Sequence, residues 1–114
     1  MTTLFGIKNC DTVKKARHWL EDADIEYEFH DFRSDGLTRD QVEGWLRHLD
    51  WQHLVNRRST TWKQLPAAER DGLGVDNVVE LVLEYPTLIK RPVLETDGVI
   101  RVGFNAADYA AIFR

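Results

Sequence analysis

The chain has 114 residues, of which 43% are hydrophobic and 30% are charged, and its net charge is −4. This length suits one domain that buries its own core without disulfides or structural metals. The acidic balance excludes a general basic surface for nucleic acid, so we expect no direct nucleic-acid partner.

The first third of the chain has the pattern of a βαβ unit. Residues 3–7 form a short apolar run that is typical of a buried strand. Asp11 and Thr12 can cap a following helix, whose apolar positions recur at helical spacing at Val13, Ala16, Leu20 and Ala23. Residues 25–30 alternate apolar and polar side chains and predict a second strand. Such a unit is right-handed and its strands are parallel.

The middle of the chain is predicted to be helical. Thr38 and Gln41 form a capping box. An apolar stripe with helical spacing follows the box, at Val42, Trp45, Leu46 and Leu49. Residues 61–68 predict a shorter helical piece, and residues 76–85 predict another helix that Pro86 ends.

The last part of the chain predicts a hairpin and a helix. Residues 92–95 and 99–102 flank Asp97-Gly98, a strong signal for a tight antiparallel turn, and a helix follows from about Asn105. The order is therefore βαβ, a helical block at about 36–86, and ββα. We expect an α/β, thioredoxin-like fold in one domain, 1–114, with the block inserted between its two halves.

Cys10 is the one cysteine of the sequence. It can form no internal disulfide, and it cannot support a metal site alone. The N-terminal residues do not resemble a signal peptide, and the apolar run at 78–83 is too short to cross a bilayer. We therefore expect a cytoplasmic protein without membrane contact, in a reducing compartment. In such a protein a lone cysteine is either a small, inert core residue or a reactive thiol.

The position of Cys10 favours the reactive thiol. It lies between the first predicted strand and the first predicted helix, where unpaired N–H groups and the helix dipole stabilise an anion such as a thiolate. The positive charge of Lys8 would also favour a thiolate at Cys10, whereas the negative charge of Asp11 would disfavour it. A Cys-x-x-Cys pair would need a second cysteine at Val13, so no resolving thiol exists in this sequence.

Lys90-Arg91-Pro92 is the second candidate segment. In a thioredoxin core, the loop before the third strand lies opposite the start of the first helix, and a proline there tends to be cis. Arg91 would then present a planar guanidinium for a carboxylate or oxyanion close to Cys10. The alternative is a surface arginine before an edge-strand proline. The four histidines show no metal-ligand spacing, so we expect no metal site.

Four ordered segments, 6–16, 57–62, 89–92 and 102–104, resemble the arsenate reductase/Spx family. Within that family the sequence is most similar to the small bacterial YffB-like proteins. The resemblance covers nearly the whole chain. It implies a bacterial source and a thioredoxin-like fold with a helical insertion, in agreement with the element order.

The resemblance also implies site residues. The family's nucleophilic cysteine matches Cys10, and the arginine before the proline matches Arg91. The arginine of the insertion matches Arg58, which we prefer, or Arg57. Phe104 holds the place of the third oxyanion-binding arginine, so we expect a poor arsenate reductase. Substrate-binding residues are expected at Lys8, Asn9, Arg57, Pro92 and Phe104.

The combined prediction is a thiol oxidoreductase that uses one nucleophilic cysteine and depends on glutathione. We expect no bound cofactor. Glutathione is the expected co-substrate, since an external thiol must resolve any mixed disulfide on Cys10. Partners would be glutathione or another small thiol, and a glutaredoxin or another protein. The alternative is an Spx-like regulator that docks on a partner such as RNA polymerase, although Val13 removes the Cys-x-x-Cys usual in those regulators.

Overall fold

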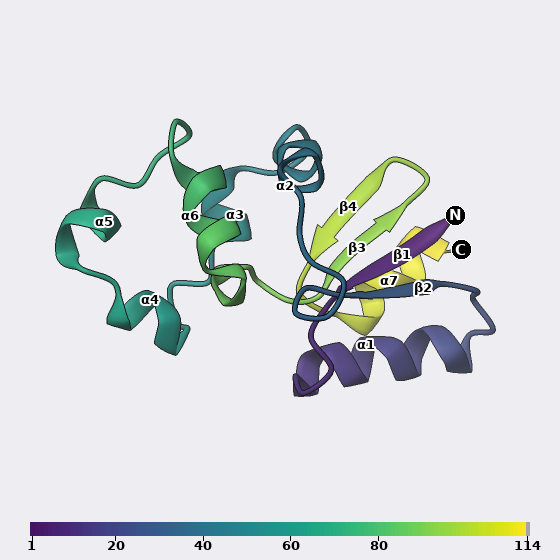
Figure 1. Ribbon diagram of the computed structural model, residues 1–114. Helices are drawn as coiled ribbons and strands as arrows, with labels where there is room; N and C mark the ends of the chain where they lie inside the picture. The colour runs from purple at the N-terminus through teal and green to yellow at the C-terminus, as the bar shows by residue number, and fades with distance from the viewer. Residues whose placement is uncertain (114) are drawn as a thin grey trace. The chain divides into compact units, whose positions relative to one another are not determined.

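The computed structural model describes residues 1–113, which form two compact units (Figure 1). The first unit comprises Met1–Gly36 and the chain from Arg91 onward, and the second is Leu37–Lys90. The second unit overlaps the predicted insertion at 36–86. That the whole chain makes one domain stays a prediction, and each unit is described by itself below.

The first unit contains a sheet of strands in the order β2-β1-β3-β4 (Figure 1). Strands β1 and β2 are parallel, whereas β3 is antiparallel to both β1 and β4. This is the predicted thioredoxin-like arrangement. The elements of the unit are β1 (Thr2–Gly6), α1 (Asp11–Asp22), β2 (Glu28–Asp31), β3 (Val93–Thr96), β4 (Val99–Val102) and α7 (Ala106–Phe113).

The core of the first unit joins the two central strands to both helices. Its fully buried members are Leu4 of β1, Leu94 of β3, Ala16 and Leu20 of α1, and Tyr109 of α7. Because one cluster holds side chains from α1 and α7 together, both helices pack on the same face of the sheet. Burial of such apolar side chains is the main stabilising contribution to the unit.

The start of α1 differs from the prediction. Asp11 and Thr12 were expected to cap the helix, but the N-cap residue is Cys10, with φ −113° and ψ 123°. The carbonyl oxygen of Cys10 accepts the first helical hydrogen bond from Lys14 N–H at 3.0 Å. An N-cap residue needs extended backbone dihedrals, which Cys10 has, while Asp11 is placed in the first turn, where the helix dipole favours its charge.

The second strand also begins later than predicted. It covers Glu28–Asp31 instead of 25–30. The chain turns away from the end of α1 at Asp24, whose backbone is in the left-handed region with φ 57°. Ile25 then packs against the core and donates its N–H to Leu20 O. The apolar alternation at 25–30 thus includes a helix-ending turn.

The hairpin prediction is confirmed: Asp97 and Gly98 both have positive φ, as a two-residue primed turn requires.

The second unit is helical, as predicted. Its elements are α2 (Arg39–Leu46), α3 (Trp51–Leu54), α4 (Thr60–Gln64), α5 (Ala67–Asp71), α6 (Val78–Glu84) and the 3₁₀ helix η1 (Pro86–Leu88). The capping box of Thr38 and Gln41 is present, with N–H to side-chain oxygen distances of 2.9 and 3.2 Å. The core of this unit includes Val42, Trp45, Leu54, Val78, Val82, Leu88 and Ile89.

Two helical boundaries of the second unit were not predicted. The helix expected at 61–68 is divided into α4 and α5, because Pro66 between them has no N–H for a continuing helix. Helix α3 was missed altogether. Asp50 starts it, with its side chain accepting a hydrogen bond from Gln52 N–H at 3.0 Å.

Asp31, at the end of β2, holds the connection between β1 and α1. Its side chain is buried, and its carboxylate accepts hydrogen bonds from the N–H groups of Arg33 at 2.7 Å, Ser34 at 3.4 Å and Lys8 at 3.3 Å. Burial alone raises the pKa of Asp31. The three N–H donors and the positive charge of Lys8 outweigh burial, so its pKa lies below the usual value.

A glycine is needed where β1 passes α1. A Cβ added at Gly6 would lie 2.7 Å from Val13 Cγ2 and 3.3 Å from Cγ1, and Val13 is fully buried. We expect Gly6→Ala to lower the free energy of unfolding by about 1–3 kcal/mol through overpacking, measured by urea denaturation. The matched control is Gly44→Ala inside α2, where an added Cβ meets no atom within 4 Å. The control should gain about 0.4–1 kcal/mol, and equal effects of the two substitutions would contradict the close approach.

The Asp31 carboxylate predicts a pH-dependent stability difference. We expect Asp31→Asn to lower the free energy of unfolding by about 1–3 kcal/mol at pH 7, because the N–H donors lose a charged acceptor. The folded-state pKa lies below the unfolded one. The difference from wild type should therefore be complete above about pH 4 and shrink as the pH falls through the folded-state pKa. The exposed Asp22→Asn is the control. A difference that does not change between pH 7 and pH 3 would show that the carboxylate charge is not what stabilises the connection.

Candidate active site

Three chain segments meet at one end of the sheet. Phe5 pairs with Val93, and Val93 pairs with Val102, so the end of β1, the start of β3 and the end of β4 lie in one row. The segment that leads from β1 to Cys10, the Arg91-Pro92 segment and the segment that follows β4 are therefore at the same end. Gly103 N–H donates to Pro92 O at 2.9 Å and joins two of these segments directly.

Cys10 is half-buried at the start of α1. As the N-cap residue it lies next to the first-turn N–H groups of the helix, yet its side chain accepts no capping hydrogen bond. A serine or aspartate at this position would normally satisfy those groups. Cysteine at this position instead places a thiol beside these groups, at the positive end of the helix dipole.

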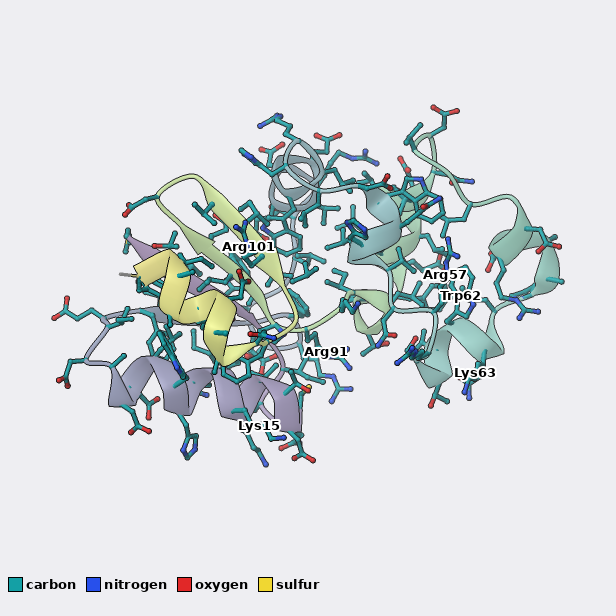
Figure 2. The ribbon with its side chains drawn as sticks, turned by 180° about the vertical axis from the view of Figure 1, so that it is seen from behind. Lys15, Arg57, Trp62, Lys63, Arg91 and Arg101 are labelled. Atoms are coloured by element: carbon teal, nitrogen blue, oxygen red, sulfur yellow. The ribbon has the colours of Figure 1, made fainter. Side chains whose placement is uncertain are left out.

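Arg91 and Pro92 lie directly before β3. The peptide bond between them is cis, as the sequence predicted for a proline at this place. Pro92 is buried and Arg91 is half-buried. Figure 2 shows Arg91 at the end of the sheet where β1 leads into α1. The guanidinium is thus at the correct end of the unit to bind an anionic group of a substrate that reacts with Cys10.

Lys8 and Asn9 form an exposed turn between β1 and Cys10. This turn is held through the Lys8 backbone, whose N–H donates to Asp31, so both side chains are accessible to a ligand. Sequence analysis missed Asp31 as the residue that positions this turn. The sequence did offer a signal for a turn at this place. Aspartate side chains commonly accept N–H bonds from the residues that follow, and Asp31 stands at the carboxyl end of a strand with Ser34 three positions later.

Phe104 follows β4 and belongs to the core. Its ring is perpendicular to that of Tyr109, with centroids 4.9 Å apart, and it packs against the core cluster as a partly buried side chain. The nearest arginine in sequence, Arg101, is exposed, and its Nε lies 3.4 Å from Asp108 Oδ2 on α7. Phe104 therefore presents an apolar ring, and Arg101 already has an anionic partner.

Arg57 and Arg58 both belong to the second unit, and they have different surroundings. The guanidinium of Arg57 lies over the rings of Trp51 and Trp62. Arg58 is exposed, and its backbone N–H donates to Asn56 Oδ1 at 3.0 Å. The preference for Arg58 as the arginine that serves Cys10 stays a prediction.

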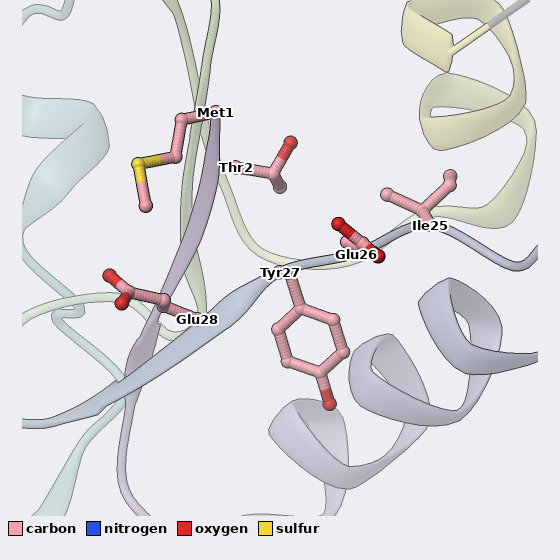
Figure 3. A pocket seen from close by; sticks show the side chains of 6 residues that line it. All are labelled: Met1, Thr2, Ile25, Glu26, Tyr27 and Glu28. Carbon is pink, nitrogen blue, oxygen red and sulfur yellow. The ribbon is translucent and has the colours of Figure 1, made fainter.

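A pocket of about 570 Å³ in the first unit lies at the other end of β1 (Figure 3). Met1, Thr2 and Glu28 line it together with residues of the connection that precedes β2. The Tyr27 hydroxyl accepts a hydrogen bond from Arg17 at 3.1 Å and donates one to Glu21 at 2.6 Å, both on α1. Since Met1 precedes β1 and Cys10 follows it, this pocket is not part of the cysteine site.

Within residues 1–113, no three His, Cys, Asp or Glu side chains are grouped so that they could hold a metal ion. The same residues contain no helix that is long and apolar enough to cross a membrane.

Comparison with known proteins gives three informative relatives. A solved structure described as the YFFB (PA3664) protein is 42% identical, covers 97% of each chain and has a TM-score of 0.93. An arsenate reductase (ArsC) related protein from Brucella melitensis is 46% identical over 99% of this chain and 94% of that chain, with a TM-score of 0.77. The global transcriptional regulator Spx of Listeria innocua is 31% identical over 92% of this chain and 81% of its own length.

The model of the ArsC family matches residues 5–112, which include the Cys10, Arg91 and Phe104 segments. The sequence-based prediction of the arsenate reductase/Spx family and its YffB-like branch is therefore confirmed. A thioredoxin-like sheet that carries a cysteine at the start of its first helix and an arginine before a cis-proline agrees with that match. The chain belongs to the ArsC family.

Proposed function

We propose that this protein is a cytoplasmic thiol oxidoreductase that uses Cys10 as its only nucleophile and glutathione as its co-substrate. The observation that carries the proposal is the position of Cys10 as the N-cap residue of α1 with no capping hydrogen bond from its side chain. An inert core cysteine would lie on the buried face of an element. Cys10 instead lies half-exposed at the helix end that favours an anion.

The proposed reaction follows from the presence of a single thiol. The Cys10 thiolate attacks one sulfur of a substrate disulfide, forms a mixed disulfide and releases the other half of the substrate as a thiolate. Val13 stands where the second cysteine of a Cys-x-x-Cys pair would be, so the chain cannot break the mixed disulfide by itself. A glutathione thiolate then attacks the substrate sulfur of the mixed disulfide. A disulfide between glutathione and that half of the substrate forms, and Cys10 leaves as its reduced thiolate. No bound cofactor is required for these steps.

The residues around Cys10 are proposed to bind the peptide part of the thiol. Arg91 offers parallel N–H donors for a glutathione carboxylate, and Lys8 offers a second cation in an exposed turn. Asn9 and the Pro92 segment complete the surface next to the sulfur. In the second unit, Arg58 is the proposed further cation, with Arg57 as the alternative. A glutaredoxin or another protein is the proposed macromolecular partner.

A docking role is the second candidate function. It is favoured by the 31% identity to Spx, a global transcriptional regulator, over 92% of this chain. In that case the chain would bind a protein partner such as RNA polymerase, and the thiol would not be needed for turnover. Cys10→Ser separates the two functions, since it removes a nucleophile but leaves a docking surface unchanged.

The first test is the reaction with oxidised glutathione. We expect one glutathione adduct, located on Cys10, because the thiol is accessible and no second cysteine can displace it. Intact-protein mass spectrometry before and after incubation measures the adduct, and Cys10→Ser should show none. A thiol that stays unmodified in the native protein but reacts after unfolding would contradict the proposal.

The same assay tests Arg91. We expect Arg91→Gln to slow adduct formation roughly tenfold to a hundredfold, because a charge-assisted pair contributes about 1.5–3 kcal/mol. Arg101→Gln is the matched control, since Arg101 is an exposed arginine of the same unit whose partner is Asp108. Circular dichroism should show both variants folded. If the two variants react equally fast, Arg91 does not bind the substrate.

Arsenate should be a poor substrate. A multiply charged oxyanion needs cations and donors when it is desolvated, and Phe104 presents an aromatic ring where the family has a third arginine. We expect little arsenate-dependent NADPH oxidation in the presence of glutathione, glutaredoxin and glutathione reductase, and a higher rate for Phe104→Arg. Phe104→Leu controls for the lost contact with Tyr109 and should not gain activity. Fast wild-type turnover at low arsenate concentration would contradict this argument.

A further inference from the structure

A second pocket lies wholly within the second unit, among α3, α4 and α5. Its volume is about 660 Å³, which is in the range that holds small ligands. Two tryptophans and two arginines dominate its lining. The residues that matter for the argument are Trp51, Trp62, Arg57, Arg70, Asp71 and Gln52.

Arg57 is an exposed residue whose guanidinium lies near the rings of two tryptophans. The guanidinium carbon of Arg57 is 5.6 Å from the ring centroid of Trp51 and 6.0 Å from that of Trp62. Figure 2 shows Arg57 and Trp62 next to each other. Contacts of this kind reduce the freedom of the side chain but leave the N–H groups in the guanidinium plane available to an acceptor.

Arg70 supplies the second observation. Its Nε is buried and donates no hydrogen bond to any residue in 1–113. A buried donor without an acceptor is costly, and such groups are rare in native proteins. Neither Arg57 nor Arg70 takes part in the ion pairs of residues 1–113. The pocket is therefore lined by two guanidinium groups that have no anionic partner in residues 1–113, and an anion from outside the unit would balance their charge.

We propose that this pocket binds a carboxylate that is attached to an aromatic or apolar group. The planar forks of Arg57 and Arg70 match the two oxygens of a carboxylate, and the indole rings provide surface for the adjacent apolar group. Asp71 also lines the pocket, so its three charged side chains sum to +1. A single negative charge balances this sum, whereas the double charge of a phosphate does not.

A carboxylate next to an aromatic group can come from two kinds of ligand. One is a terminal or free carboxylate, as in a chain that ends in an aromatic residue or in a free aromatic acid. The other is the side chain of an internal aspartate that stands beside an aromatic residue. Cys10 is not among the residues that line this pocket, and Arg58 is the preferred cation for the Cys10 reaction, so Cys10→Ser should bind the same ligands with unchanged affinity. Failure of one proposal therefore leaves the other intact.

The test is an NMR titration of the four tryptophan indole N–H signals. The probe is N-acetylphenylalanine, and its neutral amide is the matched control ligand. We expect the acid to shift the signals of Trp51 and Trp62, and to leave Trp19 of the first unit and the buried Trp45 unchanged. A blocked peptide with an internal Asp-Phe pair and an amidated end distinguishes the two sources. Binding of the acid alone assigns the site to a terminal or free carboxylate, and binding of the peptide assigns it to an internal acidic segment.

Matched variants connect the signal to the arginines. Arg57→Gln and Arg70→Gln should each weaken binding about tenfold or more, and Lys63→Gln, an exposed cation of α4 outside the lining, should not. If Arg70→Gln does not fold, Arg70→Lys keeps the charge without the planar fork and should also weaken binding. Equal binding of the acid and the amide, no binding of either carboxylate, or unchanged affinity in both arginine variants would overturn the proposal.

Discussion

Two hydrogen bonds fix the connection between β1 and α1, and the position of the thiol depends on them. Phe32 N–H donates to Gly6 O at 2.9 Å, which continues the pairing of β1 with β2 by one step. Lys8 N–H then donates to the buried carboxylate of Asp31. Because these bonds hold the chain where it leaves β1, the turn starts from a fixed point, and Cys10 follows two residues after Lys8 as the N-cap residue of α1.

The close contact between β1 and α1 restricts what can stand near the thiol. Val13 is fully buried, and its methyl groups fill the space in which a Cβ of residue 6 would lie. The position that a Cys-x-x-Cys pair would use for its second thiol is therefore a packing position in this chain. The structure gives Cys10 no partner sulfur and places apolar volume there, which is consistent with a reaction that an external thiol completes.

The sequence predicted those features that depend on local chemistry. The capping box at Thr38 and the Asp97-Gly98 hairpin each follow from a few adjacent residues, and both are present. The cis bond before Pro92 is also present, and it was predicted from the place of this proline in the expected fold. The errors occur where tertiary contacts decide. Residues 25–30 have strand-like alternation, yet the packing of Ile25 against the core delays β2 until Glu28.

The residues of the candidate site also separate into those that a local pattern indicates and those that depend on tertiary contacts. Cys10 and Arg91 could be proposed from the sequence because an unusual residue type stood beside a recognisable helix start or proline. The residues after Asp31 could indicate only its local bonds to Arg33 and Ser34. Its hydrogen bond with Lys8 N–H spans 23 residues, so its part in positioning the turn before Cys10 was missed. The Arg57-Arg58 pair could not be resolved for a related reason, since its surroundings depend on where Trp51 and Trp62 are folded.

The structure shows that these two adjacent arginines are not equivalent. Arg57 lies over two indole rings and lines a pocket of its own unit, so moving it to another ligand would cost the contacts that hold it. Both arginines are exposed, but Arg58 makes neither an ion pair nor a ring contact with residues in 1–113, so its guanidinium can change partner at little cost. This difference supports the proposal of Arg58, rather than Arg57, as the cation that this segment supplies. Arg57 shares its pocket with a second arginine, Arg70, and this pairing of cations is what supports the proposed carboxylate site there.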